Sequence, residues 1–246
     1  MKMRLDVFLF EKGFAQSRTE AKNLISCGAV TYLGRVITKP SFDIDEETTE
    51  IAVDRSSIRF VSRGGEKLAF AFSNFRLDAS DRLCIDVGAS SGGFTDCLLQ
   101  NGAKRVLSVD SGSGQLVDSI RNDPRVVVYE GFNARYMTRA DFDFVPSLAV
   151  MDVSFISATL IIPAVFNVLS DEADFVCLIK PQFEVGKSGL GKGGIVKDDK
   201  IRRGAVQRVC EFAEEIGFSL VRVINSPIQG GDGNIEFLAH FRKAKK

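Results

Sequence analysis

Residues 83–95 read Leu-Cys-Ile-Asp-Val-Gly-Ala-Ser-Ser-Gly-Gly-Phe-Thr. An apolar run leads into Asp86, and small residues follow it before the next apolar segment begins at Phe94. A strand that passes through a small-residue turn into a helix lets a ligand approach the backbone closely. The stretch therefore predicts a nucleotide-type cofactor site where a buried strand ends.

The spacing of the small residues distinguishes two types of cofactor site. A dinucleotide-binding fingerprint needs glycine at its first, third and sixth positions, and counting from Gly88 the third position is Ser90. The spacing resembles instead motif I of S-adenosylmethionine-dependent methyltransferases. This resemblance implies S-adenosylmethionine as the cofactor, bound by Asp86, Gly88, Ala89, Ser90, Gly92, Gly93 and Phe94. The alternative is an ordinary glycine-rich turn of an α/β protein.

The chain after residue 66 alternates between apolar runs of strand length and segments with helical spacing. We expect strands at 82–87, 105–110, 126–129, 147–152, 174–180, 219–225 and 236–242, and helices at 93–101, 115–121, 157–169 and 199–216. Such alternation is typical of a parallel sheet covered on both faces. The predicted fold is α/β, with a seven-stranded Rossmann-like methyltransferase sheet whose last strand is antiparallel to its neighbours.

The first 60 residues have a different pattern, which predicts a small α+β domain. Apolar residues between 4 and 12 recur at helical spacing. Ser17 and Glu20 have the spacing of a capping box that starts a second helix, and Gly28 ends it. We expect strands at 29–32, 35–38 and 49–53, the first two forming a hairpin.

Residues 59–66 join the two patterns. We expect Ser62 to cap the helix that follows and Gly64-Gly65 to form a flexible joint. The predicted division of the chain is a small amino-terminal domain at 1–60, a linker at 61–66 and a methyltransferase domain at 67–246.

Charge is unevenly distributed in this chain, although 32 basic and 32 acidic residues balance overall. The first 40 residues hold seven basic and three acidic side chains, whereas residues 41–54 hold six acidic and no basic ones. The motifs of the basic part are Arg4-Leu5-Asp6, Ser17-Arg18-Thr19-Glu20-Ala21, Gly28-Ala29-Val30 and Gly34-Arg35-Val36. They resemble the small RNA-binding domain first described in a ribosomal small-subunit protein. The resemblance implies RNA contacts by Arg4, Arg18, Lys22 and Arg35. The alternative is that these are solvated surface charges.

Three charged residues stand where apolar runs of the predicted sheet stop: Asp110, Asp152 and Lys180. Ligands of an open parallel sheet bind beyond the carboxyl ends of its strands. The resemblance to methyltransferases implies that Asp110 binds the ribose hydroxyls of the cofactor and that Asp152 also contacts it. The alternative for Asp110 is a turn-forming role. A charge left buried alone is costly, so we expect Asp152 and Lys180 to pair.

Further motifs occur in order along the chain. They are Ser62-Arg63-Gly64-Gly65-Glu66-Lys67, the stretch 86–95, Asp152, Lys180 followed by Pro-Gln-Phe-Glu, and Glu236 preceded by Gly233-Asn234-Ile235. Together they resemble the haemolysin A (TlyA) family of ribosomal RNA methyltransferases, whose catalytic domain is FtsJ-like. The resemblance implies a catalytic tetrad of Lys67, Asp152, Lys180 and Glu236. It also implies methyl transfer from S-adenosylmethionine to the 2'-hydroxyl of cytidine, with ribosomal RNA or a ribosomal subunit as the partner.

The residue types of this tetrad suit the reaction. A ribose hydroxyl is a poor nucleophile, so the protein must align it with the methyl group and remove one proton. Alignment contributes roughly 7 to 11 kcal/mol and a positioned base about 3 to 5 kcal/mol, so we expect positioning to dominate. A lysine is a base at neutral pH only if burial or a second cation disfavours its charge. We expect Lys180 to be the base and Lys67 the second cation, while Asp152 and Glu236 orient the amines and oppose that shift.

Residues 186–197 form a segment rich in glycine and lysine. A phosphate-binding P-loop is excluded, because Pro181 stands where the upstream glycine is required and no helix is expected to begin at Ser188. A mobile basic loop beside the active site suits contacts to an RNA backbone. Candidate phosphate contacts are Lys187, Lys192 and Lys197, followed by Arg202 and Arg203 on the next helix. The alternative is a disordered surface loop.

Composition bears on location and on metal chemistry. Five cysteines, an odd number without paired short spacing, lie mostly in apolar runs and are expected to be reduced core residues. His240 lies in a predicted strand without a motif, and we expect it to be structural. The start of the chain lacks the apolar segment of a signal peptide, and no apolar run approaches about 18 residues. We therefore expect a cytoplasmic protein that binds neither membrane nor metal.

Three other function classes compete with RNA methylation. A membrane-damaging haemolysin needs a basic amphipathic helix, which the sequence lacks. A non-catalytic ribosome-binding or assembly factor would not need the tetrad and motif I. A small-molecule methyltransferase would not need the amino-terminal domain. The function we expect is RNA 2'-O-methylation.

Overall fold

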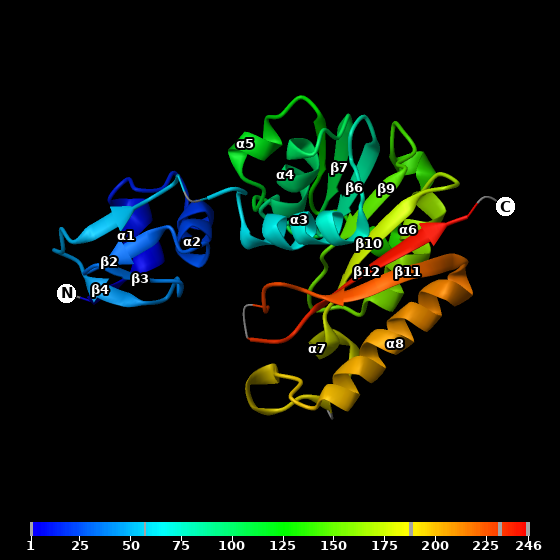
Figure 1. Ribbon diagram of the computed structural model, residues 1–246. Helices are drawn as coiled ribbons and strands as arrows, with labels where there is room; N and C mark the ends of the chain where they lie inside the picture. Colours follow the sequence, from blue (N-terminus) through cyan, green and yellow to red (C-terminus); the bar gives the residue numbers. More distant parts are fainter. Residues whose placement is uncertain (1, 57, 187–188, 231–232, 245–246) are drawn as a thin grey trace.

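The structure, a computed structural model, describes residues 2–56, 58–186, 189–230 and 233–244. The chain forms two bodies joined by one connecting segment (Figure 1). The small body has its own hydrophobic core between Leu5 and Ile58, and the two core clusters of the large body begin at Phe60. We place the domain boundary in the connecting segment, residues 54–62.

In the residues described, the small body contains two helices and five short strands. Its elements are β1 (Lys2–Arg4), α1 (Leu5–Glu11), α2 (Arg18–Ser26), β2 (Val30–Tyr32), β3 (Arg35–Val36), β4 (Asp43–Asp45) and β5 (Ile51–Val53). β1 pairs with β4, while β3, β2 and β5 form a second antiparallel sheet. Both predicted helices and the hairpin are confirmed, whereas β1 and β4 were not predicted.

The predicted capping of α2 is confirmed in part. The Ser17 hydroxyl accepts a hydrogen bond from the Glu20 amide at 3.1 Å, and Gly28 follows the helix with a φ of +78°. The reciprocal half of the capping box does not form, because the Glu20 carboxylate accepts from the Gln16 amide and from Arg55. The first turn of α2 is therefore capped by Ser17, and Glu20 also joins it to Arg55 in the connecting segment.

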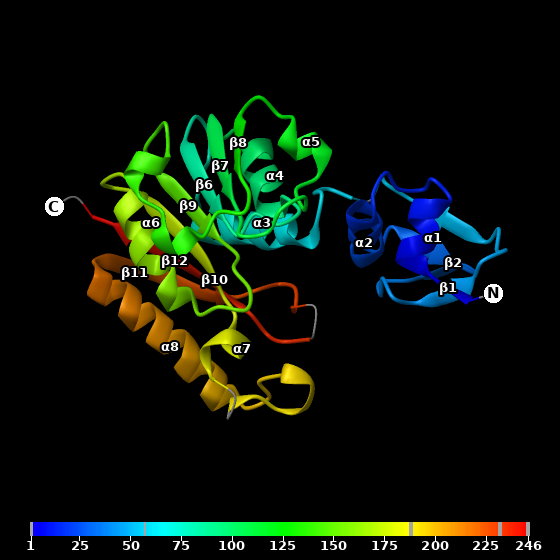
Figure 2. The same ribbon diagram turned by 180° about the vertical axis from the view of Figure 1, so that it is seen from behind.

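The large body is a sheet covered by helices on both faces (Figure 2). Its strands are β6 (Leu83–Val87), β7 (Arg105–Val109), β8 (Val126–Tyr129), β9 (Leu148–Met151), β10 (Asp174–Ile179), β11 (Phe218–Asn225) and β12 (Phe237–Lys243). The order across the seven-stranded sheet is β11-β12-β10-β9-β6-β7-β8. Strands β6 to β10 run parallel to one another, and β12 is antiparallel to both of its neighbours. The predicted sheet and its antiparallel last strand are confirmed.

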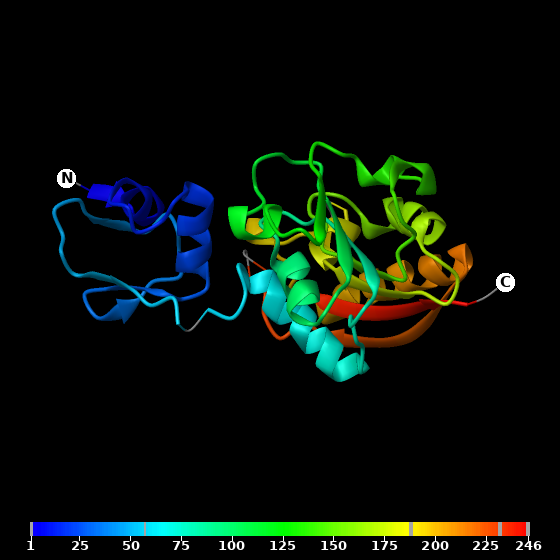
Figure 3. The ribbon, with the colours of Figure 1, turned by 90° about the horizontal axis from the view of Figure 1, so that it is seen from above.

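Helices and short 3-10 turns connect these strands. They are α3 (Arg63–Phe75), α4 (Gly93–Gln100), α5 (Asp118–Arg121), η1 (Ala134–Tyr136), η2 (Arg139–Asp141), η3 (Ala158–Leu160), α6 (Ile162–Val168), α7 (Pro181–Glu184), η5 (Lys192–Gly194) and α8 (Asp199–Ile216). Successive strand residues face opposite sides: Ile85 packs in the core with α6 and α8, and Cys84 in the core with α3 and α4. Figure 2 shows α6 and α8 together on one face, and Figure 3 shows α3 and α4 side by side.

The start of α3 differs from the prediction. Residues 63–66, expected in the linker, form the first turn of the helix. Ser62 precedes it in an extended conformation, but its side chain accepts no capping hydrogen bond. Gly65 is buried against Phe60, and a Cβ on Gly65 would overlap the phenyl ring. The two glycines therefore belong to a packed helix start and not to a flexible joint.

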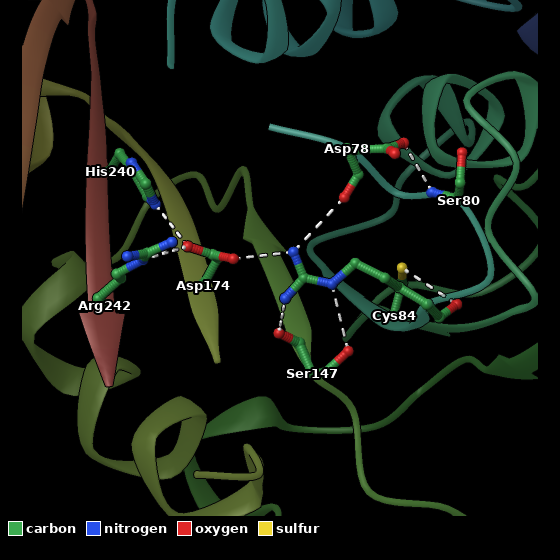
Figure 4. Close-up of polar contacts among 8 residues, drawn as sticks. Asp78, Ser80, Cys84, Ser147, Asp174, His240 and Arg242 are labelled. Carbon is green, nitrogen blue, oxygen red and sulfur yellow. Dashed lines mark hydrogen bonds and ion pairs between the residues drawn. The ribbon is translucent and has the colours of Figure 1, made fainter. Parts of the chain in front are cut away.

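A polar cluster joins the amino-terminal ends of β6, β9 and β10 (Figure 4). Arg82 donates to Asp174 at 2.8 Å and to the backbone oxygen of Ser147. His240 Nε2 and Arg242 Nε lie 2.8 and 3.3 Å from the other oxygen of Asp174. Burial raises the pKa of Asp174, but hydrogen bonds from His240 and Arg82 outweigh it and lower the pKa to about 2. His240 thus has the structural role that the sequence predicts.

Candidate active site

The turn after β6 is in direct contact with the turn after β9. Gly88 has a φ of +88°, and a Cβ at this position would lie 2.5 Å from the carbonyl oxygen of Asp152. Only glycine fits such an approach. A cavity of about 440 Å³ lies beside this contact, beyond the carboxyl ends of β6, β7 and β9. We call it the cofactor cavity.

The walls of the cofactor cavity include four residues that the sequence singles out: Gly88, Ser90, Asp110 and Asp152. Further lining residues carry no sequence motif, and among them are Phe132, Asn133, Ala134, Phe155 and Ile156. The apolar members of this second set provide a surface for a planar ring. The sequence indicates them only weakly, because they lie in loops and at the start of η1, whose positions depend on how the strands of the sheet are arranged.

Asp110 follows β7, as predicted, and two backbone amides fix its carboxylate. The Ser90 amide donates to one oxygen at 2.8 Å, and the Gly112 amide donates to the other at 2.7 Å. Each oxygen retains a further acceptor position. The carboxylate is therefore held at the cavity wall in a geometry that suits two neighbouring hydroxyl groups.

Asp86 does not line the cofactor cavity, although the sequence predicts a cofactor contact. Its side chain is fully buried, and its carboxylate accepts a hydrogen bond from the Thr95 hydroxyl at 2.7 Å. Burial raises the pKa of Asp86 to about 7; the Thr95 hydrogen bond opposes this shift, and the charge of Asp152 adds to it. The structure places Asp86 where it joins β6 to the first turn of α4.

The remaining motif I residues either pack against neighbouring side chains or line a second cavity. Gly92 precedes α4 with a φ of +96°, and a Cβ there would lie 2.8 Å from Leu116. Ala89, Gly93 and Phe94 line the second cavity, which has a volume of about 260 Å³. We call this one the catalytic cavity.

The two cavities adjoin each other, because Gly88, Ser90, Asp152 and Ser154 line both. The large body contributes Lys67 and Lys180 to the catalytic cavity. The small body contributes three residues from α2 and the turn after it: Asn23, Ser26 and Cys27. The catalytic cavity therefore lies between the two bodies.

The predicted tetrad lies in this region as two ion pairs. Lys180 Nζ lies 2.6 Å from Asp152 Oδ1 and donates to Ser154 Oγ at 2.6 Å. Lys67 donates to Glu236 Oε2 at 2.6 Å. Glu236 is 3% exposed; its partner Lys67 lines the catalytic cavity, and Glu236 lies behind it. The structure thus brings the four residues together and adds Ser154, which no sequence motif indicates.

Sheet topology explains why residues far apart in sequence meet here. Asp152 and Lys180 follow β9 and β10, which pair in parallel and end at the same edge of the sheet. Glu236 precedes β12, which is antiparallel to β10, with Phe237 opposite Ile179. The start of β12 therefore lies beside the end of β10.

Phe155 presents an exposed ring next to these pairs. The residue is 92% exposed and has a φ of +63°, in the left-handed region that side chains other than glycine seldom adopt. Its ring centroid lies 5.3 Å from that of Phe183. An apolar ring held in this way offers a stacking surface at the edge of the cofactor cavity.

The basic residues predicted to bind RNA fall into two groups. Exposed ones are Lys22 and Arg35 on the small body and Lys192, Lys197 and Arg203 on the large body, and of these Arg203 also lies 2.6 Å from Asp199. Lys187 lies outside the described residues.

The other group contacts acidic side chains. Arg4 and Arg18 lie 2.9 and 3.3 Å from the buried carboxylate of Asp6. Burial raises the pKa of Asp6, but hydrogen bonds from the two arginines outweigh it and lower the pKa. Arg202 is buried and lies 3.3 Å from Asp199. The charges of Arg4 and Arg18 are therefore partly compensated, although about half of each side chain is exposed.

The described part of the chain contains no group of three or more His, Cys, Asp or Glu side chains that could hold a metal ion. The five cysteines are free, and burial raises the pKa of Cys84 and of Cys97 to about 12. Among the helices that the structure describes, none has both the length and the apolar character needed to cross a membrane.

Known proteins similar to this chain share both of its bodies. Residues 60–243 match the model of the FtsJ-like methyltransferase family, and residues 3–49 match that of the S4 domain. A Brachyspira hyodysenteriae protein named "Hemolysin A" is 44% identical over 240 residues, which are 97% of this chain and 99% of that protein. The 16S/23S rRNA (cytidine-2'-O)-methyltransferase TlyA of Mycobacterium tuberculosis is 43% identical over 239 residues, 97% of this chain and 89% of the relative. A solved structure from Streptococcus thermophilus has 45% identity and a TM-score of 0.79, and the match covers all of this chain and 90% of that one.

The two family matches coincide with the two bodies of the structure. The FtsJ-like match includes all four tetrad residues and every strand of the seven-stranded sheet. The S4 match covers both helices of the small body. The chain therefore belongs to the FtsJ-like methyltransferase family, with S-adenosylmethionine as its methyl donor and an S4 domain at its amino terminus.

Proposed function

We propose that this enzyme transfers a methyl group from S-adenosylmethionine to the 2'-hydroxyl of cytidine in ribosomal RNA. The observation that carries the proposal is the Lys180–Asp152 ion pair, because it lies where the cofactor cavity meets the catalytic cavity. A ribose in the catalytic cavity would meet this amine beside the methyl donor. The name of the M. tuberculosis relative supports ribosomal RNA as the substrate and cytidine as the nucleotide.

The residues of the cofactor cavity fit S-adenosylmethionine. Asp110 has acceptor positions for ribose hydroxyls, and Phe132 and Ile156 provide an apolar surface for adenine. Gly88, which has no side chain, lines the cavity with its backbone. When bound, the cofactor supplies an electrophilic methyl group on a sulfonium sulfur.

The tetrad would align the ribose and accept one proton from it. Two hydrogen-bonding positions of the Lys180 amine are directed to Asp152 and Ser154, which leaves one for the substrate hydroxyl. Lys67, held by Glu236, borders the same cavity. Alignment contributes the larger part, roughly 7 to 11 kcal/mol, and Lys180 as the base adds about 3 to 5 kcal/mol.

Phe155 would receive the base of the target nucleotide. If the target nucleotide unstacks from its neighbours when its ribose enters the catalytic cavity, stacking of its base on an exposed aromatic ring offsets the cost by about 1 to 3 kcal/mol. The exposure of Phe155 and its place beside Asp152 support this role.

The small body would position the RNA. Lys22 and Arg35 are exposed for phosphate contacts, while Asn23 and Cys27 border the catalytic cavity. RNA that binds the S4 domain therefore lies close to the tetrad. With ribosomal RNA as the proposed substrate, the proposed location of the enzyme is the cytoplasm.

Reverse-transcription mapping of 2'-O-methylation in ribosomal RNA tests this function. Cells with the gene should carry the modification at specific cytidines, and cells without the gene should lack it there. Complementation by the wild type, but not by Lys180→Met, should restore it. An unchanged methylation pattern together with altered ribosomal subunit profiles would favour a non-catalytic assembly factor and refute the proposal.

A further inference from the structure

Two loops lie side by side next to the Lys67–Glu236 pair, and Figure 1 shows them in yellow and in orange to red. The first, residues 189–197, we call the lysine loop because it carries Lys192 and Lys197. The second, Gly230 with residues 233–236, we call the Glu236 turn. The lysine loop carries two exposed lysines, whereas the Glu236 turn ends at Glu236, a member of the tetrad.

The side chain of Asn234 connects the two loops. Asn234 is 1% exposed. Its Oδ1 accepts a hydrogen bond from the Val196 amide at 3.0 Å, and its Nδ2 donates to the Gly194 carbonyl at 3.1 Å. Both ends of the buried amide are thus bonded to the backbone of the lysine loop, which favours one relative position of the two loops.

Asn234 is also connected to the carboxylate of Glu236. The Asn234 carbonyl accepts a hydrogen bond from the Gly230 amide at 2.9 Å. Gly230 lies directly against Glu236, because a Cβ on Gly230 would be 2.6 Å from Glu236 Oε1. The other carboxylate oxygen accepts from Lys67. A displacement of Asn234 would therefore displace the Glu236 carboxylate and with it Lys67.

On the other side, the bonded residues lie close to the exposed lysines. The Gly194 carbonyl is two residues from Lys192, and the Val196 amide is next to Lys197. Gly193 and Gly194 have positive φ angles and no atom within 4 Å of a Cβ built on either. Side-chain packing at these glycines thus does not fix the lysine loop; the two hydrogen bonds of Asn234 do, together with the buried side chain of Val196.

We propose that Asn234 is a positioning residue that couples RNA contact at the lysine loop to the catalytic tetrad, an inference that rests on the proposed RNA methylation. Phosphate groups bound by Lys192 and Lys197 fix the lysine loop. Through the two hydrogen bonds of Asn234, the fixed loop holds Glu236 and Lys67 in place. RNA that engages the loop therefore stabilises the arrangement that methylates it.

A double-mutant cycle tests this coupling. The loop variant combines Lys192→Ala with Lys197→Ala, and Asn234→Asp keeps the acceptor for Val196 while it places an oxygen against the Gly194 carbonyl. With ribosomal RNA from cells that lack the gene as the probe, the loop variant should raise KM and also lower kcat. Asn234→Asp alone should lower kcat by about 10- to 100-fold, as misplacement of catalytic groups does. Added to Asn234→Asp, the loop variant should then raise KM only. A kcat loss that multiplies in the combined variant overturns the coupling.

Asn101→Asp is the matched control. Asn101 also donates through Nδ2 to a backbone carbonyl, that of Cys97 at 2.7 Å, but it lies at the end of α4. Its replacement should leave kcat and the effect of the loop variant unchanged. S-adenosylhomocysteine affinity, measured by calorimetry, should stay within about twofold in every variant, because none of the changed residues lines the cofactor cavity.

A measurement on the wild type keeps the inference testable if Asn234→Asp does not fold. In hydrogen exchange, the same RNA should slow exchange of the Val196 and Gly230 amides together. Slower exchange at Val196 with no change at Gly230 overturns the coupling. Failure of the proposed function gives a result that differs from failure of the coupling: the wild type would bind RNA and transfer no methyl group to it.

Discussion

Replacement of Lys180 tests the assignment of the base. Lys180→Met removes the amine and keeps the length of the side chain, whereas Lys180→Arg keeps the positive charge but cannot be deprotonated in a protein. The Lys180 amine lies 2.6 Å from both Asp152 and Ser154. Both variants remove this amine, which lies between the two acceptors and the catalytic cavity. The two variants should therefore lose the same catalytic step.

The expected magnitude follows from the role and from the burial of the pair. Loss of a positioned base lowers kcat by about 10² to 10⁴, or about 3 to 5 kcal/mol, and the two variants should agree within about tenfold. Lys180→Met also leaves the carboxylate of Asp152 without its cation. Because this carboxylate is 21% exposed, we expect a loss of about 1 to 3 kcal/mol in unfolding free energy and a folded protein.

The assay is transfer of a labelled methyl group to ribosomal RNA at saturating S-adenosylmethionine over a pH series. Lys104, an exposed lysine before β7, provides matched controls, because Lys104→Met and Lys104→Arg should leave kcat unchanged. If Lys180→Arg retains most of the wild-type rate, Lys180 acts through its charge alone and another group must accept the proton.

Three further predictions concern the cofactor, the RNA and the stability of the fold. Asp110→Asn should weaken S-adenosylhomocysteine binding by about 10- to 100-fold in calorimetry, since it removes a charge-assisted acceptor; unchanged affinity would rule out the ribose contact. Lys22→Ala combined with Arg35→Ala should reduce by about two units the slope of log affinity for RNA against log salt, with cofactor affinity unchanged, and an unaltered slope would exclude this surface from RNA binding. Asp174→Asn should lower the unfolding free energy at pH 7 by about 3 to 5 kcal/mol, because it breaks a buried ion pair. The pKa of Asp174 falls from 3.8 to about 2 on folding, so its contribution is present above pH 4 and is lost as the pH falls towards 2. Denaturant unfolding should show this acid-dependent loss in the wild type and much less of it in the variant.

The parallel sheet could be read from the sequence because its strands are buried on both faces. Runs such as Leu148 to Met151 are apolar at every position, and their ends are marked by charged residues. Since the carboxyl ends of parallel strands lie at one edge, Asp110, Asp152 and Lys180 could be placed near one another without coordinates.

Contacts between distant segments could not be predicted in the same way. The pairing of Arg18 with Asp6 depends on how α1 and α2 pack, and it adds a structural contact to a residue for which the resemblance implies an RNA contact. Asp86 has the sequence position of a cofactor ligand, but its side chain faces Thr95 inside the fold. Cys27 reaches the catalytic cavity only because the small body packs beside α3.

Roles that depend on local backbone conformation or side-chain geometry could not be predicted from the sequence either. Phe155 combines an exposed ring with a φ of +63°, which no composition rule anticipates for phenylalanine. Ser154 follows Asp152 by two residues, and only the geometry shows that its hydroxyl accepts from Lys180.

Nucleoside analysis of the reaction product tests the central claim most directly. Purified enzyme is incubated with labelled S-adenosylmethionine and ribosomal RNA from cells that lack the gene, and the RNA is digested to nucleosides for chromatography and mass spectrometry. Label is expected in 2'-O-methylcytidine, and at least about 100-fold less of it when Lys180→Met replaces the wild type. Label in base-methylated nucleosides, or no label with a folded enzyme that binds S-adenosylhomocysteine, would contradict it.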